Sequence, residues 1–150
     1  MFAMRSLLVT ASVAVAGGLF SAPAAAQFAK PEDAVRYRQS SMFLMSNHVG
    51  RLAAMARGDR PFDAAAAENS ARVVQAISRT AWEGFAKGAD SRRAKGEIWS
   101  SAAEFKAEQD KLMAETAKLV EAAATLDTLK RQVGAVAGVC KACHDKFRND

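Results

Sequence analysis

The hydrophobic residues of this chain recur three and four positions apart over four long segments, which is the spacing of amphipathic helices. The four segments cover residues 31–57, 63–80, 101–124 and 127–147. We find no run of alternating polar and apolar residues and no Asn-Gly or Asp-Gly hairpin signal. Four such helices with short to moderate connections predict an all-α protein, an antiparallel up-down-up-down four-helix bundle.

Each segment has one stripe of residues that we expect to face the interior. The stripes are Met42, Met45, Val49, Leu52 and Ala56 in the first segment, Ala67, Ala71, Val74 and Ile77 in the second, Phe105, Leu112, Leu119 and Ala123 in the third, and Leu129, Val133, Val136, Cys140, Cys143 and Phe147 in the fourth. Arg38 extends the first stripe backwards by four residues. A charge on an inward stripe needs an anion beside it, whereas a surface position would need none.

Local signals mark several helix ends. Pro31 suits the first position of a helix, and Gly58 suits the position after its end. Ser101 and Glu104 have the spacing of a capping box at the start of the third helix. Small residues at Gly134, Ala135, Ala137 and Gly138 predict a thin helix wall, with space for a bulky group inside the bundle.

Residues 1–26 have a composition unlike the rest. A single Arg5 precedes an apolar run, and small residues follow up to Ala26, which is typical of a cleaved secretory signal peptide. The run is short for a bilayer span of about 20 residues, so a retained membrane anchor is the weaker interpretation. We therefore expect an exported, periplasmic protein of residues 27–150, with no membrane span after cleavage.

Composition and charge narrow the classes of function. Half of the residues are hydrophobic and a quarter are charged, the balance of an ordinary globular protein. The formal net charge is +5, with the charges scattered and few aromatic residues between them. This pattern does not favour a nucleic-acid partner.

The candidate chemistry lies near the C-terminus. Cys140, Cys143 and His144 form the pattern Cys-x-x-Cys-His, which is typical of covalent c-type haem attachment. On a helix the three residues share one face, because neighbours lie three and four apart. Two thiols on that face can join the vinyl groups of one porphyrin, and the histidine can present its imidazole to the iron. The sequence thus predicts one covalently attached haem c per chain.

Three other uses of the cysteines are weaker. A Cys140–Cys143 disulfide would close a very small loop with little entropic benefit. A redox Cys-x-x-Cys pair belongs near a βαβ unit, and this chain has no credible strand. A zinc site needs about four ligands, whereas the chain offers two cysteines and two histidines, with His48 far away in sequence.

The chain as a whole resembles cytochrome c′ and its class II relatives. The resemblance covers residues 27–150 and includes the stretch from Gln27 to Ala34, Tyr37-Arg38-Gln39, Glu97-Ile98-Trp99, and Cys140 to Asp145 with Phe147-Arg148. The late position of Cys-x-x-Cys-His, on the final helix, distinguishes this class from other c-type cytochromes.

The resemblance implies a set of roles. Cys140 and Cys143 would hold the haem, and His144 would be the axial ligand of its iron. The other implied pocket residues are Arg38 and Gln39 near the propionates, Phe85 in the distal pocket, Lys95 and Glu97 at the haem edge, and Arg148 near the axial histidine. Core packing remains open for Phe85, and an exposed tail position remains open for Arg148.

The sixth coordination position separates two mechanisms. In an antiparallel bundle the early part of the first helix faces the late part of the fourth, and Met42 is the inward residue at that level. Met42 also matches the family's distal position, with Met45 as a second candidate and His48 as a weak one. If Met42 only packs on the haem, the iron is five-coordinate and open to NO and CO. If its sulfur binds, the protein is low-spin and suited to electron transfer alone.

These features favour a periplasmic haem protein for electron transfer, with a five-coordinate iron that binds small gases. We expect no enzymatic activity, because a peroxidase would need a distal histidine or arginine where Met42 lies. A haem-free helical adaptor does not account for Cys-x-x-Cys-His. The resemblance also implies a homodimer through the first two helices, while the redox partner protein cannot be identified from the sequence.

Overall fold

The computed structural model describes residues 27–150, so the signal-peptide prediction for residues 1–26 lies outside the described residues. The elements, in chain order, are α1 (Pro31–Arg57), α2 (Ala64–Thr80), the short 3₁₀ helix η1 (Ala81–Phe85), α3 (Glu97–Ser100), α4 (Ala102–Ala122) and α5 (Leu126–Phe147). The four long helices lie within two residues of their predicted bounds. The four-helix bundle expected from the hydrophobic spacing is therefore confirmed.

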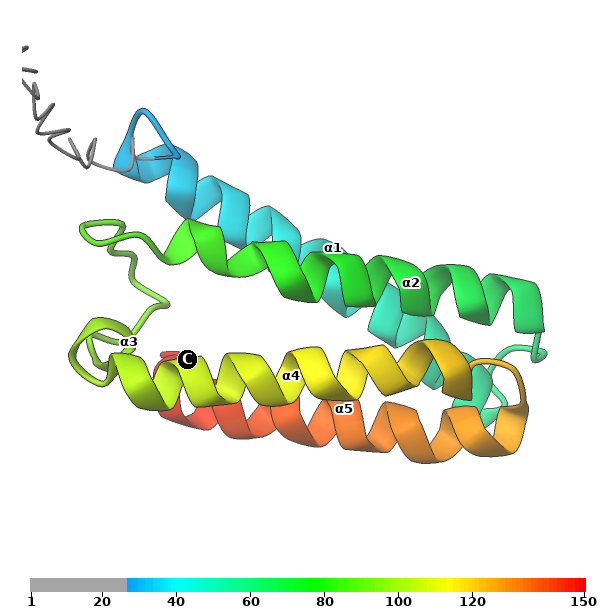
Figure 1. The fold of residues 1–150 in the computed structure, drawn as a ribbon. Coiled ribbons are helices and arrows are strands. Elements are labelled where there is room, and N and C mark those ends of the chain that lie inside the picture. The colour runs from blue at the N-terminus through cyan, green and yellow to red at the C-terminus, as the bar shows by residue number, and fades with distance from the viewer. Residues whose placement is uncertain (1–26) are drawn as a thin grey trace, which may run out of the picture.

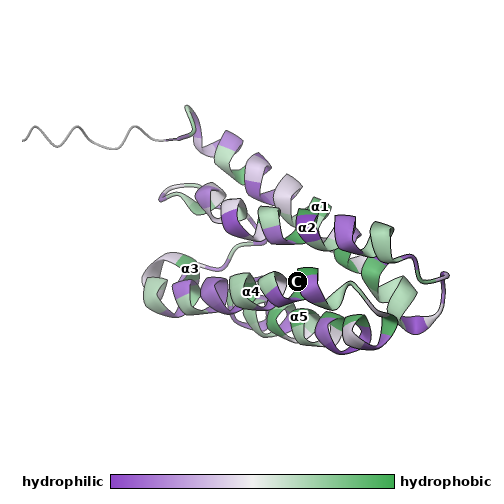
Figure 2. Cartoon of the chain, turned by 45° about the vertical axis from the view of Figure 1, so that its right-hand side comes forward, coloured by the Kyte–Doolittle hydropathy of each residue, from purple (hydrophilic) through white to green (hydrophobic). Residues whose placement is uncertain are grey.

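The long helices form a closed ring of antiparallel neighbours. Helix α1 packs against α2 and α5, and α4 packs against α2 and α5. Figure 1 shows the two pairs as layers, α1 with α2 and α4 with α5, and it places α3 and the C-terminus at the end of the bundle where α1 begins. Each helix presents hydrophobic and hydrophilic residues around its surface (Figure 2).

The main core runs along the middle of the bundle and follows the predicted stripes closely. Its buried members are Met45, Leu52, Met55, Ala67, Ala71, Val74, Leu112, Leu119, Ala123, Leu129, Val133 and Val136. Met42, Val49 and Ile77 are half-buried at its margin. Met55 takes the place expected for Ala56, because the stripe ends with a step of three rather than four residues.

A second, aromatic cluster lies at the end of the bundle near α3. Ile98, Phe105 and Phe147 are buried there, and Trp82, Phe85, Ala94, Trp99 and Cys143 pack against them. The Phe105 ring stands edge-on to both Phe85 and Phe147, with centroids 5.0 and 5.1 Å away. Such edge-to-face pairs stabilise packing beyond simple area burial. Trp82 contacts both clusters and connects them.

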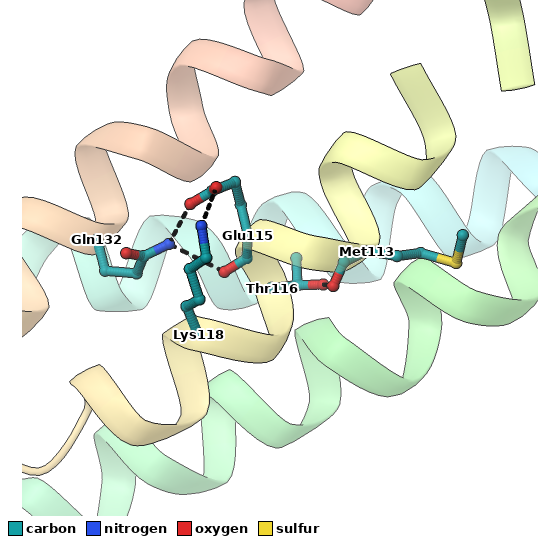
Figure 3. A network of polar contacts seen from close by, with 5 residues as sticks. All are labelled: Met113, Glu115, Thr116, Lys118 and Gln132. Carbon is teal, nitrogen blue, oxygen red and sulfur yellow. Dashed lines mark hydrogen bonds and ion pairs between the residues drawn. The ribbon is translucent and has the colours of Figure 1, made fainter. Parts of the chain in front are cut away.

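Polar side chains tie α4 to its neighbours. The buried hydroxyls of Ser78 and Thr116 share a 2.8 Å hydrogen bond between α2 and α4. On the other side of α4, the Gln132 amide donates to the Glu115 carboxylate at 2.6 Å and to the Glu115 carbonyl at 3.0 Å. Lys118 also donates to the Glu115 carboxylate, and Figure 3 shows this network between α4 and α5. The Ser78–Thr116 bond joins the two layers, and the Glu115 network joins α4 to α5 within one layer.

Helix ends are set by local chemistry, with one exception to our prediction. Pro31 opens α1, and Gly58 ends it with φ +81°, a left-handed conformation that favours glycine. The predicted capping box at Ser101 is wrong, because the Ser101 side chain makes no capping hydrogen bond. Instead, the Ser101 amide donates to the Glu97 carbonyl, so α3 runs almost directly into α4.

The predicted thin wall on the last helix is also wrong. Gly134, Ala135, Ala137 and Gly138 are all exposed, so they form the outer face of α5 instead of lining the interior. Small residues instead permit a close approach elsewhere. A Cβ atom on Gly84 would lie 2.7 Å from the Ala34 carbonyl oxygen and 2.7 Å from Arg38 Cβ. This glycine therefore allows η1 to lie directly on α1.

Within residues 27–150, no helix is both long and apolar enough to cross a membrane.

Candidate functional site

The last turns of α5 carry the three residues of the Cys-x-x-Cys-His pattern. Cys140, Cys143 and His144 are all half-buried, and both cysteines are free thiols. They lie on one side of the helix because of their three- and four-residue spacing. In residues 27–150, no group of three or more His, Cys, Asp or Glu side chains is placed to hold a metal ion by itself.

The surroundings of the two thiols fit a large planar apolar group. Cys140 packs against the main core, whereas Cys143 packs against the aromatic cluster. A group joined to both sulfurs therefore borders apolar side chains on two sides. Burial raises the pKa of Cys140, and burial together with the Glu108 carboxylate raises that of Cys143 to about 11. Both sulfurs are consequently neutral thiols at physiological pH.

His144 combines partial burial with access to a polar hollow. Burial lowers the pKa of its imidazole, the positive charge of Arg148 lowers it further, and Asp145 opposes the shift. The neutral ring, with a free nitrogen lone pair, is therefore the dominant form at pH 7, as a metal ligand requires. A hollow of about 210 Å³ lies beside it and is lined by Lys95, His144, Asp145, Arg148 and Asp150.

Hydrogen bonds join the segment before α3 to the end of α5. The Lys95 amide donates to the Phe147 carbonyl at 3.0 Å, and the Asn149 amide donates to the Arg93 carbonyl at 3.0 Å. The Asn149 side chain donates to the Arg92 carbonyl at 3.0 Å, and Lys95 Nζ donates to the Asp145 carbonyl at 3.0 Å. We call this contact between residues 91–95 and 145–149 the clasp. It brings Lys95 and Arg148 to the same hollow as His144.

Arg38 is buried, with 4% of its surface exposed, as its place on the inward stripe predicts. Its guanidinium donates to the carbonyls of Gly84 and Ala89 at 2.9 and 2.6 Å, and to the Ser91 hydroxyl at 2.9 Å. It also lies 5.0 Å from the centroid of the Phe85 ring. Three neutral oxygens and an aromatic face thus contact the guanidinium, and the Asp90 carboxylate opposes the lowering of its pKa that burial causes. Arg38 anchors η1 and the segment that follows it to α1.

The three candidates for the distal position differ in burial. Met45 is 5% exposed and belongs to the main core, whereas Met42 is half-buried at its margin, as Cys140 is. His48 is half-buried, and its Nδ1 atom is buried without a hydrogen-bond partner. Met42 is therefore the methionine whose side chain is not already enclosed by the core.

Three predicted site residues remain, which are Gln39, Glu97 and Phe85. Gln39 and Glu97 are exposed, on α1 and at the start of α3. Phe85 packs against the aromatic cluster, and its distal-pocket role stays a prediction. The sequence reasoning did not assign a site role to Trp82, which contacts both clusters. The sequence feature that could have indicated this contact is a large aromatic residue directly after the second predicted helix.

A four-helix bundle with Cys-x-x-Cys-His at the end of its last helix defines a class of c-type haem proteins. Residues 33–148 match a family described as Cytochrome C′. A cytochrome c′ from Rubrivivax gelatinosus is 46% identical over 127 residues, which cover 81% of this chain and 98% of that protein. The chain belongs to the cytochrome c′ family, whose members carry covalently bound haem c.

Solved structures agree in fold. One is a nitric oxide complex of a variant of cytochrome c prime from Alcaligenes xylosoxidans, with TM-score 0.79 and 42% identity. Another is a carbon monoxide-bound variant from the same organism, also with TM-score 0.79 and 42% identity. Each match covers 83% of this chain and all of the solved chain.

Proposed function

We propose that this chain is a periplasmic electron-transfer protein whose haem c is attached to Cys140 and Cys143, with His144 as the axial ligand of the iron. The observation that carries this proposal is the placement of the three residues on one half-buried side of α5, where an apolar cluster borders each cysteine. When bound, the haem supplies one iron that changes its charge by one electron and has a position for a second axial ligand.

The protein's own residues have distinct tasks in this proposal. The two thioether links and His144 hold the cofactor on α5. The main core and the aromatic cluster exclude water from its faces, which strengthens electrostatic control of the reduction potential. Arg38, Lys95 and Arg148 would provide positive charge for the propionate carboxylates, which need such partners. Phe85 supports this arrangement through its contact with Arg38.

We further propose that Met42 is a lid instead of a ligand, so that the iron is five-coordinate and binds NO and CO. Two observations support this. Variants of a related protein from Alcaligenes xylosoxidans have been solved with nitric oxide and with carbon monoxide. Met42 is also only half-buried, and a methionine side chain has enough rotatable bonds to move aside for a small ligand.

The second candidate is a low-spin electron carrier with His144 and Met42 as axial ligands. The same half-buried position of Met42 at the core margin supports it. Catalysis is not part of either candidate: the distal candidate is a thioether, which cannot donate or accept protons as a peroxidase residue does.

The attachment sites are tested by mass and extraction. Expressed in a host with haem-attachment machinery, the mature protein should begin at Gln27 and have the mass of residues 27–150 plus one haem. Acid-acetone should leave its colour on the protein. A Cys140→Ala, Cys143→Ala double variant should lose all of the covalent haem, and a coloured, acid-stable double variant would refute the assignment.

Met42 controls access to the iron in the favoured candidate. We expect wild-type ferrous protein to be high-spin at neutral pH, and Met42→Ala to remain high-spin while binding CO about tenfold faster or more. Stopped-flow absorbance measures both. Met113→Ala is the matched control, since Met113 is a half-buried methionine of α4, and it should leave the CO rate unchanged.

The same variant separates the two candidates. A low-spin wild type that becomes high-spin on Met42→Ala would establish the low-spin carrier. A low-spin wild type that Met42→Ala does not change would contradict both candidates and direct attention to Met45 or His48.

A further inference from the structure

Positive charge is concentrated on two segments that meet at the end of the bundle that carries His144. Residues 87–97 and 141–150 together hold seven Lys or Arg and four Asp or Glu, a net charge of +3. The whole of residues 27–150 holds 20 Lys or Arg and 16 Asp or Glu, a net charge of +4. Most of the net charge thus lies on 21 residues. We call this region the basic end.

Two adjacent arginines are the most prominent cations of the basic end. Arg92 and Arg93 are both exposed. Their backbone carbonyls accept hydrogen bonds from the Asn149 side chain and from the Asn149 amide. An isolated antiparallel bridge between Ala94 and Arg148 continues the same contact. The clasp therefore fixes the backbone of Arg92 and Arg93, while their guanidinium groups take no part in it and remain exposed.

A fixed backbone matters for binding. A loop that must become ordered when a partner arrives loses conformational entropy, and this cost weakens binding. The carbonyl oxygens of Arg92 and Arg93 are already used within the protein, so the arginine side chains are presented without rearrangement of the chain. The basic end is thus preorganised rather than merely charged.

The basic end also lies next to the proposed redox centre. Lys95 and Arg148 line the hollow that His144 lines, and Lys95 belongs to the clasp. A partner that contacts Arg92 and Arg93 would therefore sit beside the helix end that bears the axial ligand. In Figure 1 the C-terminus and the segment before α3 lie at this same end of the bundle.

We propose that the basic end is the docking surface for an acidic redox protein. This proposal rests on the proposed electron-transfer function. Complementary charge steers diffusional encounter and favours one orientation, and both effects depend on ionic strength. The partner and this protein exchange one electron, so that one is oxidised as the other is reduced, and no proton transfer is required.

The basic end lacks exposed large apolar side chains, and this argues against a membrane as its binding partner. Stable attachment of a protein to an anionic membrane takes an apolar anchor in addition to basic charge. The large hydrophobic side chains that are exposed in residues 27–150 are Phe43 and Leu44, 67% and 48% exposed, and they lie on α1. The basic end has none, and its four acidic residues are placed among the cations, which suits a mixed protein interface.

The experiment uses the mature haem-loaded protein and two small oxidants of opposite charge. Hexacyanoferrate(III) is a trianion, and tris(phenanthroline)cobalt(III) is a trication; each takes one electron from the reduced protein. We expect the double variant Arg92→Glu, Arg93→Glu to react about tenfold or more slowly with the anion at low ionic strength. The rate with the cation should rise, and added salt should remove both changes.

A matched control is available at the opposite end of the molecule. Lys130 and Arg131 are adjacent, exposed cations in the first turns of α5. The double variant Lys130→Glu, Arg131→Glu has the same net charge as the test variant and should leave the anion-to-cation rate ratio close to that of the wild type. Equal effects of the two double variants would overturn the proposal, because net charge alone would then explain the rates.

A binding measurement gives a readout that does not depend on electron transfer. In the ferrous CO complex, which is diamagnetic, poly-L-glutamate should perturb the amide resonances of residues 91–95 and 145–149 of the wild type, and Arg92→Glu, Arg93→Glu should abolish this effect. Asn149→Ala, which removes one bond of the clasp, should weaken the perturbation without changing the charge. Perturbations located elsewhere would overturn the proposal. So would binding to phosphatidylglycerol vesicles through the basic end with no effect of poly-L-glutamate.

Failure of this proposal is distinguishable from failure of the proposed function. If reduced wild-type protein reacts with neither oxidant, the electron-transfer function is wrong. If it reacts with both, but the charge-reversed basic end behaves like the control, only the docking surface is wrong.

Discussion

His144→Ala is expected to abolish the native axial bond while keeping the haem attached. Cys140 and Cys143 remain, so the colour should stay on the protein after acid-acetone extraction. The imidazole is lost, and with it the neutral nitrogen that burial and Arg148 make available. Ferrous absorption and resonance Raman spectra should lose the signature of histidine ligation entirely, and the rate of CO binding should change at least tenfold.

The chain contains a matched control for this change. His48→Ala removes the other histidine of the protein, and it should leave the ferrous spectrum as in the wild type. Because His48 Nδ1 has no hydrogen-bond partner, its removal breaks no bond of that atom. A native spectrum in His144→Ala would show that another residue is the axial ligand. Loss of the native spectrum in His48→Ala would assign that role to His48.

Arg38→Leu should cause a large loss of stability at this end of the bundle. The substitution removes three hydrogen bonds and leaves the carbonyls of Gly84 and Ala89 without their buried donor. A buried polar group left unpaired costs about 1–3 kcal/mol, so we expect the free energy of unfolding to fall by about 3 kcal/mol or more. Urea denaturation followed by circular dichroism measures this loss.

Arg36→Leu is the control for the arginine change. Arg36 lies two residues away on the same helix, its side chain is 78% exposed, and its nearest carboxylate is 3.9 Å distant. Exposed ion pairs contribute little, so this variant should change stability by about 0.5 kcal/mol or less. Equal losses for the two variants would contradict the anchoring role that we assign to Arg38.

The spacing of hydrophobic residues was sufficient to predict the bundle, because the face that each helix turns to the core depends mainly on which of its residues are removed from water. The stripes of the third and fourth segments, from Phe105 to Ala123 and from Leu129 to Val136, are buried as predicted. The same reasoning placed Arg38 inside. It also predicted a helix for residues 140–144, which brings both cysteines and the histidine to one side.

Two predictions that depended on the position of another helix were wrong. The capping box at Ser101 failed because α3 precedes α4 directly and supplies the Glu97 carbonyl instead. The predicted thin wall failed because Gly134 and Gly138 lie on the side of α5 that no other helix covers. In both cases the local sequence was compatible with the prediction, and the position of another element decided the outcome.

The sequence by itself determined the helices, their inward stripes and the attachment pattern of Cys140, Cys143 and His144, since these follow from spacing along one chain segment. Only the tertiary structure decided what surrounds them. It gave Arg38 neutral oxygens and an aromatic ring as partners, and it joined residues 91–95 to the end of α5 through Asn149. Such contacts join residues about 50 positions apart, and no periodicity within a helix encodes which distant backbone groups will meet.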